Sequence, residues 1–202
     1  MLFRSNLDYE TLKTLRDNGL RLLLVGFESG HQQILDNINK GIRLDVARQF
    51  MKNCTKLGIK VHGTFILGLP VETPETIDAT IRFACEVNPH TIQVSIAAPY
   101  PGTALYNQAQ ANGWFADGSL ITSSGYQTSS LHYPSLSSSQ IEDSVERMYR
   151  RFYFRRRAIV PIVKEMLSDP QMLRRRLREG REFFSYLKER RRQQQQAHAD
   201  AA

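Results

Sequence analysis

The stretch from residue 60 to residue 75, KVHGTFILGLPVETPE, constrains the fold most. Its first eight residues are rich in β-branched and aromatic side chains and predict a buried strand. Gly68 and Pro70 end that pattern, and Thr73-Pro74 provides the residue types preferred at the N-cap and first position of a helix. In parallel α/β folds ligands bind at the carboxyl end of such a strand, where a glycine leaves N–H groups free. An ordinary βα turn has the same pattern.

The rest of the first 112 residues repeats this alternation of strands and helices. Strands are predicted over residues 22–27 and 91–97, and the continuous apolar run LLLVGF is typical of a strand covered on both faces. The helices are expected at residues 8–18, 31–37, 44–57 and 74–88, with a last one ending near residue 112. This order predicts right-handed βαβ units and a parallel sheet, the α/β class. Counting residues 1–4 as the remnant of a strand, the chain holds at most four strands, a partial (β/α) barrel.

Charge and composition divide the chain into four parts. Residues 1–116 are the α/β body, 117–139 a serine-rich loop, 140–192 a helical appendage, and 193–202 a low-complexity tail expected to be disordered. Residues 1–146 carry 11 basic and 14 acidic side chains, whereas residues 147–192 carry 16 and 5. The basic character therefore belongs to the appendage and calls for an acidic partner or surface.

Two further absences exclude classes of protein. The sequence has no apolar run near the length of about 20 residues that a membrane-spanning helix needs. Cys54 and Cys85 both fall on apolar helix faces, which is typical of small core residues in a reducing cytoplasm and does not indicate a disulfide framework.

Three strand ends carry a family resemblance: GFESG at 26–30, FILGLPVET at 65–73 and AAPYPGT at 97–103. In this order and with these βα units between them, they resemble the C-terminal half of a radical S-adenosylmethionine (SAM) barrel. The closest likeness is to the group that carries an N-terminal cobalamin-binding domain. The resemblance covers residues 1–112 and implies SAM and a [4Fe–4S] cluster as cofactors. It leaves open whether cobalamin takes part in the chemistry.

The resemblance also implies a role for each matched position. The implied cofactor-binding residues are Glu28, Ser29, Phe65, Ile66, Gly68 and Tyr100. Glu28 and Ser29 match positions that contact the ribose and amino-acid parts of SAM, where a carboxylate and a hydroxyl suit ribose hydroxyls. Phe65, Ile66 and Gly68 match the strand that holds the adenine, and Tyr100 lies where the last loop reaches the site. The alternatives are a helix-terminal charge for Glu28, plain core for Phe65 and Ile66, and a rim aromatic for Tyr100.

Two other residues near these ends have weaker assignments. Lys40 could meet the cofactor carboxylate, although a lysine before a glycine is more often a solvated helix end. His62 lies in a predicted strand, where a hydrogen-bonded core histidine is more common than a ligand.

One departure from the family pattern is decisive for catalysis. Radical SAM enzymes hold their cluster through a CxxxCxxC motif, whose three thiolates leave one iron open for SAM. This chain has two cysteines, on two different predicted helices, which cannot build that site. The cluster ligands and any cobalamin domain are therefore expected outside this chain, and no catalytic residue is assigned. We expect the chain to be the C-terminal part of a longer enzyme; a short protein that has lost catalysis is the alternative.

The appendage has a second, less specific resemblance. RRFYFRRRAI at 150–159 and LRRRLREGREFFSYLKERR at 173–191 are similar to the tail of hopanoid-biosynthesis members, which form a cyclitol ether on the polar side chain of a bacterial membrane triterpenoid. A lipid substrate implies a cytoplasmic protein that visits the inner membrane face. Basic residues near an anionic surface contribute about 1 kcal/mol each, and Phe183, Phe184 and Tyr186 could insert shallowly. A helical cap with solvated arginines is the alternative.

Two other functions fit the same residues. An RNA-modifying, methylthiotransferase-like member of the superfamily would use the basic tail as an RNA arm, with its aromatic side chains stacking on bases. A non-catalytic half barrel would use the strand-end loops to bind a nucleoside.

Overall fold

The computed structural model describes residues 7–116 and 129–160, together with part of the chain between residues 163 and 188. Several predictions lie outside the described residues: the strand remnant at 1–4, most of the serine-rich loop, the aromatic side chains of Phe183 and Tyr186, and the tail at 193–202. The chain forms two units, residues 1–149 and residues 150–202. The first unit contains the sheet.

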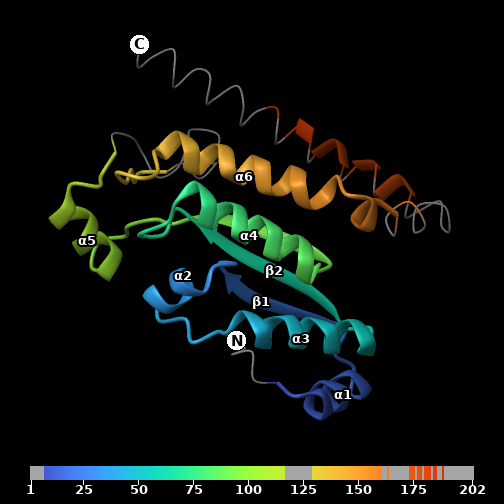
Figure 1. Cartoon of the computed structure of the whole chain (residues 1–202). Helices are drawn as coiled ribbons and strands as arrows, with labels where there is room; N and C mark the ends of the chain where they lie inside the picture. Colours follow the sequence, from blue (N-terminus) through green and yellow to red (C-terminus); the bar gives the residue numbers. More distant parts are fainter. Residues whose placement is uncertain are drawn as a thin grey trace. The chain divides into compact units, whose positions relative to one another are not determined.

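Three parallel strands form the sheet of the first unit in the order β1-β2-β3. The first two of them are labelled in Figure 1. The strands are β1 (Leu22–Glu28), β2 (Lys60–Leu67) and β3 (Thr91–Ile96). The helices are α1 (Tyr9–Asp17), α2 (Gln32–Asn37), α3 (Leu44–Leu57), α4 (Pro74–Val87), α5 (Ala104–Asn112) and α6 (Ser138–Tyr153). The predicted α/β class and parallel sheet are confirmed, and each strand lies within a residue or so of its predicted range.

Local sequence accounts for where the helices start and stop. The Asp8 side chain accepts a hydrogen bond from the Thr11 N–H at 2.8 Å and begins α1. Thr73 begins α4 with a reciprocal capping box to Thr76, and Pro74 occupies the first turn, where its missing N–H costs nothing. Gly58 ends α3 in the left-handed conformation that only glycine adopts without strain.

The two faces of the sheet are covered differently. Along β1 and β2, buried and more exposed side chains alternate, and paired residues such as Leu24 and His62 point to the same side. Leu22 and Leu24 are 52% and 61% exposed, whereas Leu23 and Val25 are buried. The prediction that β1 is covered on both faces is therefore wrong for the described residues, in which no layer lies over the side of Leu22 and Leu24. We call that side the open face.

Helices α3 and α4 cover the other face. Phe27 of β1 stacks on Phe65 of β2 at 5.6 Å between ring centroids and meets Phe83 of α4 edge-on at 6.0 Å. The two helices are joined at the surface by a bidentate ion pair between Arg48 and Glu86. The core of the first unit is thus the layer between the sheet and these two helices.

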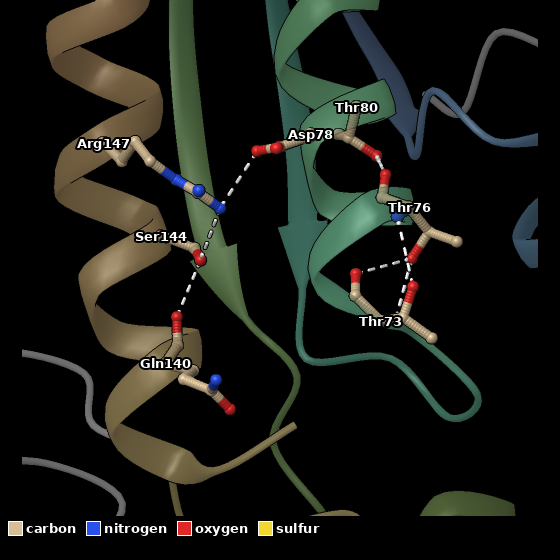
Figure 2. A network of polar contacts seen from close by, with 7 residues as sticks. All are labelled: Thr73, Thr76, Asp78, Thr80, Gln140, Ser144 and Arg147. Carbon is tan, nitrogen blue, oxygen red and sulfur yellow. Dashed lines mark hydrogen bonds and ion pairs between the residues drawn. The ribbon is translucent and has the colours of Figure 1, made fainter. Parts of the chain in front are cut away.

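The first three turns of α6 add to the same unit. Its buried stripe of Ile141, Val145 and Met148 was expected from the helical spacing. Arg147 reaches Asp78 of α4 at 3.1 Å, and Figure 2 shows this side chain between α6 and α4 with Ser144 beside it. The Tyr149 hydroxyl accepts a hydrogen bond from the Val94 N–H of β3 at 3.0 Å. This segment of α6 therefore satisfies a backbone group of β3 and docks on α4.

Gly30 offers a direct test of the packing between β1 and α4. A Cβ at this position would overlap the Thr80 Cα and the Ala79 carbonyl oxygen of α4. Because these are backbone atoms, we expect Gly30→Ala to lower the free energy of unfolding by about 2 kcal/mol or more. Urea denaturation followed by circular dichroism measures it. Gly180→Ala, where a Cβ meets nothing, is the matched control and should stay within about 1 kcal/mol; equal effects would contradict the packing.

Candidate functional site

The parallel order brings the carboxyl ends of the three strands to one edge of the sheet. Glu28 is the last residue of β1, Gly68 follows the last residue of β2, and Tyr100 lies four residues after β3. Figure 1 shows the arrowheads of β1 and β2 pointing to the end where α2 lies. The predicted site residues at these strand ends therefore share one edge.

Glu28 has the most unusual backbone of the predicted residues. Its φ is +62°, and the pairing of β1 with β2 shifts register between Gly26 and Glu28. The turn folds its carboxylate back over Gly26, where a Cβ would overlap Oε1. Lys40 Nζ lies 2.5 Å from that oxygen, and both side chains are largely buried, at 11% and 20% exposed for Glu28 and Lys40. The result is a shielded ion pair on the open face at the end of β1.

Ser29 points the other way. It is fully buried, and its hydroxyl lies 3.1 Å from the Thr80 hydroxyl of α4. The Gly30 N–H donates to the same Thr80 oxygen at 2.9 Å, and the His31 N–H donates to Ser29 Oγ. The Ser29 hydroxyl thus joins the end of β1 to α4 on the helix-covered face.

Phe65 and Ile66 also lie on opposite faces of β2. Phe65 is fully buried against Phe27 in the layer under the helices. Ile66 is half-buried and packs against the apolar cluster of Ile34, Leu69 and Ala97, which is built from α2 and two strand-end loops. Of these two, Ile66 is the side chain that the open face presents near the carboxyl edge.

The loop after β2 is held by its own buried carboxylate. Glu72 Oε2 accepts hydrogen bonds from the Gly68 N–H at 2.7 Å and the Leu69 N–H at 3.0 Å. The prediction that the glycine leaves free N–H groups for a ligand is therefore wrong. Gly68 still has a φ of +80°, so the residue type is needed for the turn itself.

Burial raises the pKa of Glu72 to about 7, against the lowering effect of its two N–H donors. Its other oxygen, Oε1, is buried and has no hydrogen-bond partner among the described residues. Tyr133, in the last part of the serine-rich loop, donates its hydroxyl to the Gly68 carbonyl at 2.8 Å. The pKa of Tyr133 is raised mainly by burial of its hydroxyl and, to a smaller extent, by the charge of Glu72.

Sequence reasoning missed both Glu72 and Tyr133. A signal existed for Glu72, because a carboxylate between a glycine turn and a helix N-cap has nearby N–H groups to accept from. No local signal existed for Tyr133, which contacts Gly68 across 65 residues.

Tyr100 lies on the outer rim and is 56% exposed. A cavity of about 540 Å³ opens nearby, lined by parts of the connections that follow all three strands. Its wall includes the amides of Asn37, Asn39 and Gln108 and the apolar side chains of Leu69, Pro70 and Trp114. Tyr100 is not among the lining residues, so the cavity adjoins the predicted site and does not contain its rim aromatic.

The remaining polar residues do not form a metal site. The described residues contain no group of three or more His, Cys, Asp or Glu side chains placed to hold an ion. Cys54 is fully buried on α3, and burial raises the pKa of its thiol to about 12, so it stays protonated. Cys85 lies on α4. The remaining candidate, His62, is already engaged in a 2.6 Å hydrogen bond with Thr91 on the neighbouring strand. Cys54 and Cys85 thus lie on two different helices, and the described residues offer no set of three thiolates for an iron–sulfur cluster.

Comparison with known proteins agrees with this geometry. Residues 3–84 match the family model of the Radical SAM superfamily. An uncharacterized methyltransferase of Pyrococcus horikoshii is 31% identical over 158 residues, 76% of this chain and 33% of the relative. The anaerobic magnesium-protoporphyrin IX monomethyl ester cyclase of Cereibacter sphaeroides is 29% identical over 149 residues, 74% of this chain and 24% of the relative.

Solved structures show the same fold. Coproporphyrinogen III oxidase (HemN) of Escherichia coli aligns with a TM-score of 0.52 at 17% identity, over 72% of this chain and 30% of that one. The radical SAM methyltransferase TsrM of Kitasatospora setae aligns with a TM-score of 0.54 at 18% identity, over 73% and 34%. This chain thus spans about a third of the length of these proteins.

The fold is that of part of a radical SAM barrel. The chain is a member of the radical SAM superfamily and is related to its methyltransferases. Enzymes of this superfamily use SAM and a [4Fe–4S] cluster, and a TsrM structure contains cobalamin and the cluster.

The raised pKa of Glu72 predicts how stability depends on pH. The folded state holds the Glu72 proton up to about pH 7, whereas the unfolded state releases it near pH 4.5. Stability should therefore fall as pH rises between these values, by about 3 kcal/mol from this residue, and then level off. Urea denaturation from pH 4 to pH 8 measures the slope, and Glu72→Gln should remove this part of it.

The matched control is Glu75→Gln on the exposed first turn of α4. Its hydrogen bond from Thr73 holds the pKa of Glu75 below the usual range, so it titrates below this window. A wild-type profile that is flat between pH 5 and pH 7, or one that Glu72→Gln leaves unchanged, would contradict the assignment.

Proposed function

We propose that this chain is the C-terminal half of a radical SAM barrel and holds the adenosine part of SAM within a longer enzyme. The observation that carries the proposal is the parallel order β1-β2-β3, which brings three family-like loops to one edge. The buried ion pair of Glu28 and Lys40 lies on the open face at that edge. Bound to a reduced cluster held by residues outside this chain, SAM would supply a 5′-deoxyadenosyl radical for hydrogen abstraction, and this chain would hold its adenosine part.

The residues of this chain bind the adenosine part of SAM and shield it from solvent. The Glu28 carboxylate accepts hydrogen bonds from ribose hydroxyls, and the ion pair with Lys40 holds that carboxylate in place on the open face. Ile66 offers an apolar surface to the adenine, next to Leu69 and Ala97. Ser29 and Phe65 support this edge from the helix-covered face. We keep the adenine role of Gly68 and the rim role of Tyr100 as parts of the proposal.

The remaining strands of the barrel join at β1. Tyr149 of α6 already satisfies an N–H of β3, and α6 docks on α4 beside it. On the β1 side, Leu22 and Leu24 are exposed and need cover. The N-terminal half of the same enzyme, with its CxxxCxxC loop and a cobalamin-binding domain, is the partner that supplies this cover.

For the substrate we propose a membrane lipid, the hopanoid whose polar side chain becomes a cyclitol ether. The support is the second unit, residues 150–202, which combines exposed apolar and basic side chains. Its large apolar side chains that are 37% or more exposed are Phe154, Ile159, Val160, Val163, Leu173, Leu177 and Phe184. Arginines such as Arg156, Arg157 and Arg178 are exposed among them. No described helix is long and apolar enough to cross a membrane, so we propose peripheral binding at the cytoplasmic face.

The activity proposal is tested on the longer protein, reconstituted anaerobically with iron and sulfide. We expect it to convert SAM to 5′-deoxyadenosine after reduction, measured by liquid chromatography. Glu28→Gln should raise the KM for SAM about tenfold or more, because the ribose loses a charged acceptor. Glu86→Gln on the outer surface of α4 is the control. No 5′-deoxyadenosine above a cluster-free sample would contradict the function.

The membrane proposal is tested by sedimentation with vesicles. The chain should pellet with phosphatidylglycerol-containing vesicles and not with pure phosphatidylcholine, and Arg156→Gln, Arg157→Gln and Arg178→Gln together should weaken binding at least tenfold at low salt. A control replaces three exposed cations of the first unit, Lys52, Lys60 and Arg82, by glutamine. Equal losses in both variants, or retention on tRNA but not on vesicles, would overturn the membrane assignment; the latter favours an RNA arm.

A further inference from the structure

The backbone of Gly68 is held from two sides. Its N–H donates to Glu72 Oε2 at 2.7 Å, and its carbonyl accepts from the Tyr133 hydroxyl at 2.8 Å. Glu72 belongs to the same loop, whereas Tyr133 comes from a segment beyond the βα units. A glycine with a φ of +80° has little conformational preference of its own, so these contacts choose the orientation of the peptide that follows it.

Tyr133 is itself rigidly placed. It is 5% exposed, and its ring meets the Trp114 ring edge-on at 5.0 Å. Its backbone exchanges hydrogen bonds with Leu136, which closes a tight turn. Ser135, inside that turn, donates its hydroxyl to the Glu72 carbonyl at 3.0 Å. The turn of residues 133–136 is therefore tied to the loop after β2 at two points.

Helix α6 closes the space behind the loop. A Cβ at Gly68 would lie 3.0 Å from Cγ2 of Ile141, a fully buried residue of α6. Ile141 thus packs closely behind Gly68, and it flanks the end of β2 together with the turn of residues 133–136.

We propose that Tyr133 is a positioning residue for the cofactor edge: its hydroxyl fixes the Gly68 carbonyl and with it the strand end that faces the adenosine. This inference rests on the proposed function. It assigns a role in cofactor binding to the last part of the serine-rich loop, which lies outside residues 3–84, the part that matches the superfamily.

Tyr133→Phe is the test variant, and Tyr149→Phe is its matched control. Both remove one hydroxyl that hydrogen-bonds a backbone group, but Tyr149 bonds Val94 in the middle of β3, away from the carboxyl edge. The probe is 5′-deoxyadenosine, titrated into the chain and followed by the fluorescence of Trp114, the one tryptophan in the sequence. We expect Tyr133→Phe to weaken binding about fivefold and Tyr149→Phe to leave it unchanged.

A second variant separates the positioning role from misfolding. Ser135→Ala removes the hydrogen bond between the same turn and the Glu72 carbonyl, and like Tyr133→Phe it should weaken binding, by about twofold. Urea denaturation of all three variants separates affinity from stability, because the two tyrosine variants should lose similar stability. If the wild type binds the probe and Tyr133→Phe binds equally well, the positioning role is overturned while the proposed function stands. If the wild type does not bind, both are overturned.

Discussion

Three parallel strands in consecutive order must end at the same edge of their sheet, and the rest of the structure depends on that constraint. The pairing β1-β2-β3 makes neighbours of loops that are about 30 to 40 residues apart in the chain. It also sorts side chains by face. Leu23, Val25 and Phe27 of β1 are buried, and Phe27 meets Phe83 of α4, whereas Leu22, Leu24 and the Glu28 carboxylate belong to the open face. The shared edge of the strand ends follows from strand order and register before any side-chain chemistry is considered.

A buried carboxylate then shapes the middle loop. Glu72 gives up solvation to accept two backbone hydrogen bonds, and its raised pKa reports that cost. In return, the Gly68 and Leu69 N–H groups, which the turn would otherwise bury without partners, are satisfied. Glu28 has a different environment: it is shielded but paired with Lys40. Two glutamates at one edge thus serve separate purposes, one holding the loop and one facing the open side.

Much of the fold could be predicted from the sequence, because its signals are local. The ends of α1, α3 and α4 lie close to their predicted positions. The predictions came from glycines that end helices, from Thr73-Pro74 as a helix start, and from the helical spacing of apolar residues. Whether one or both faces of β1 are covered could not be predicted, because the apolar run LLLVGF is compatible with either arrangement. In the candidate site, too, some features were predictable and others were not. The strand ends were predictable from order alone, but the direction of the Ser29 hydroxyl, the use of the Gly68 N–H and the reach of Tyr133 depend on tertiary contacts. The roles of the six predicted cofactor residues stay predictions.

The central claim is that the carboxyl edge of this sheet holds an adenosine. The most direct test is a ¹⁵N–¹H correlation spectrum of the chain titrated with 5′-deoxyadenosine. The account predicts shifts concentrated at the amides of Glu28, Ile66 and Gly68, with those of Leu22, Lys60 and Thr91 at the opposite ends of the same strands unchanged. Shifts confined to the amino ends, or none at saturating nucleoside, would contradict it.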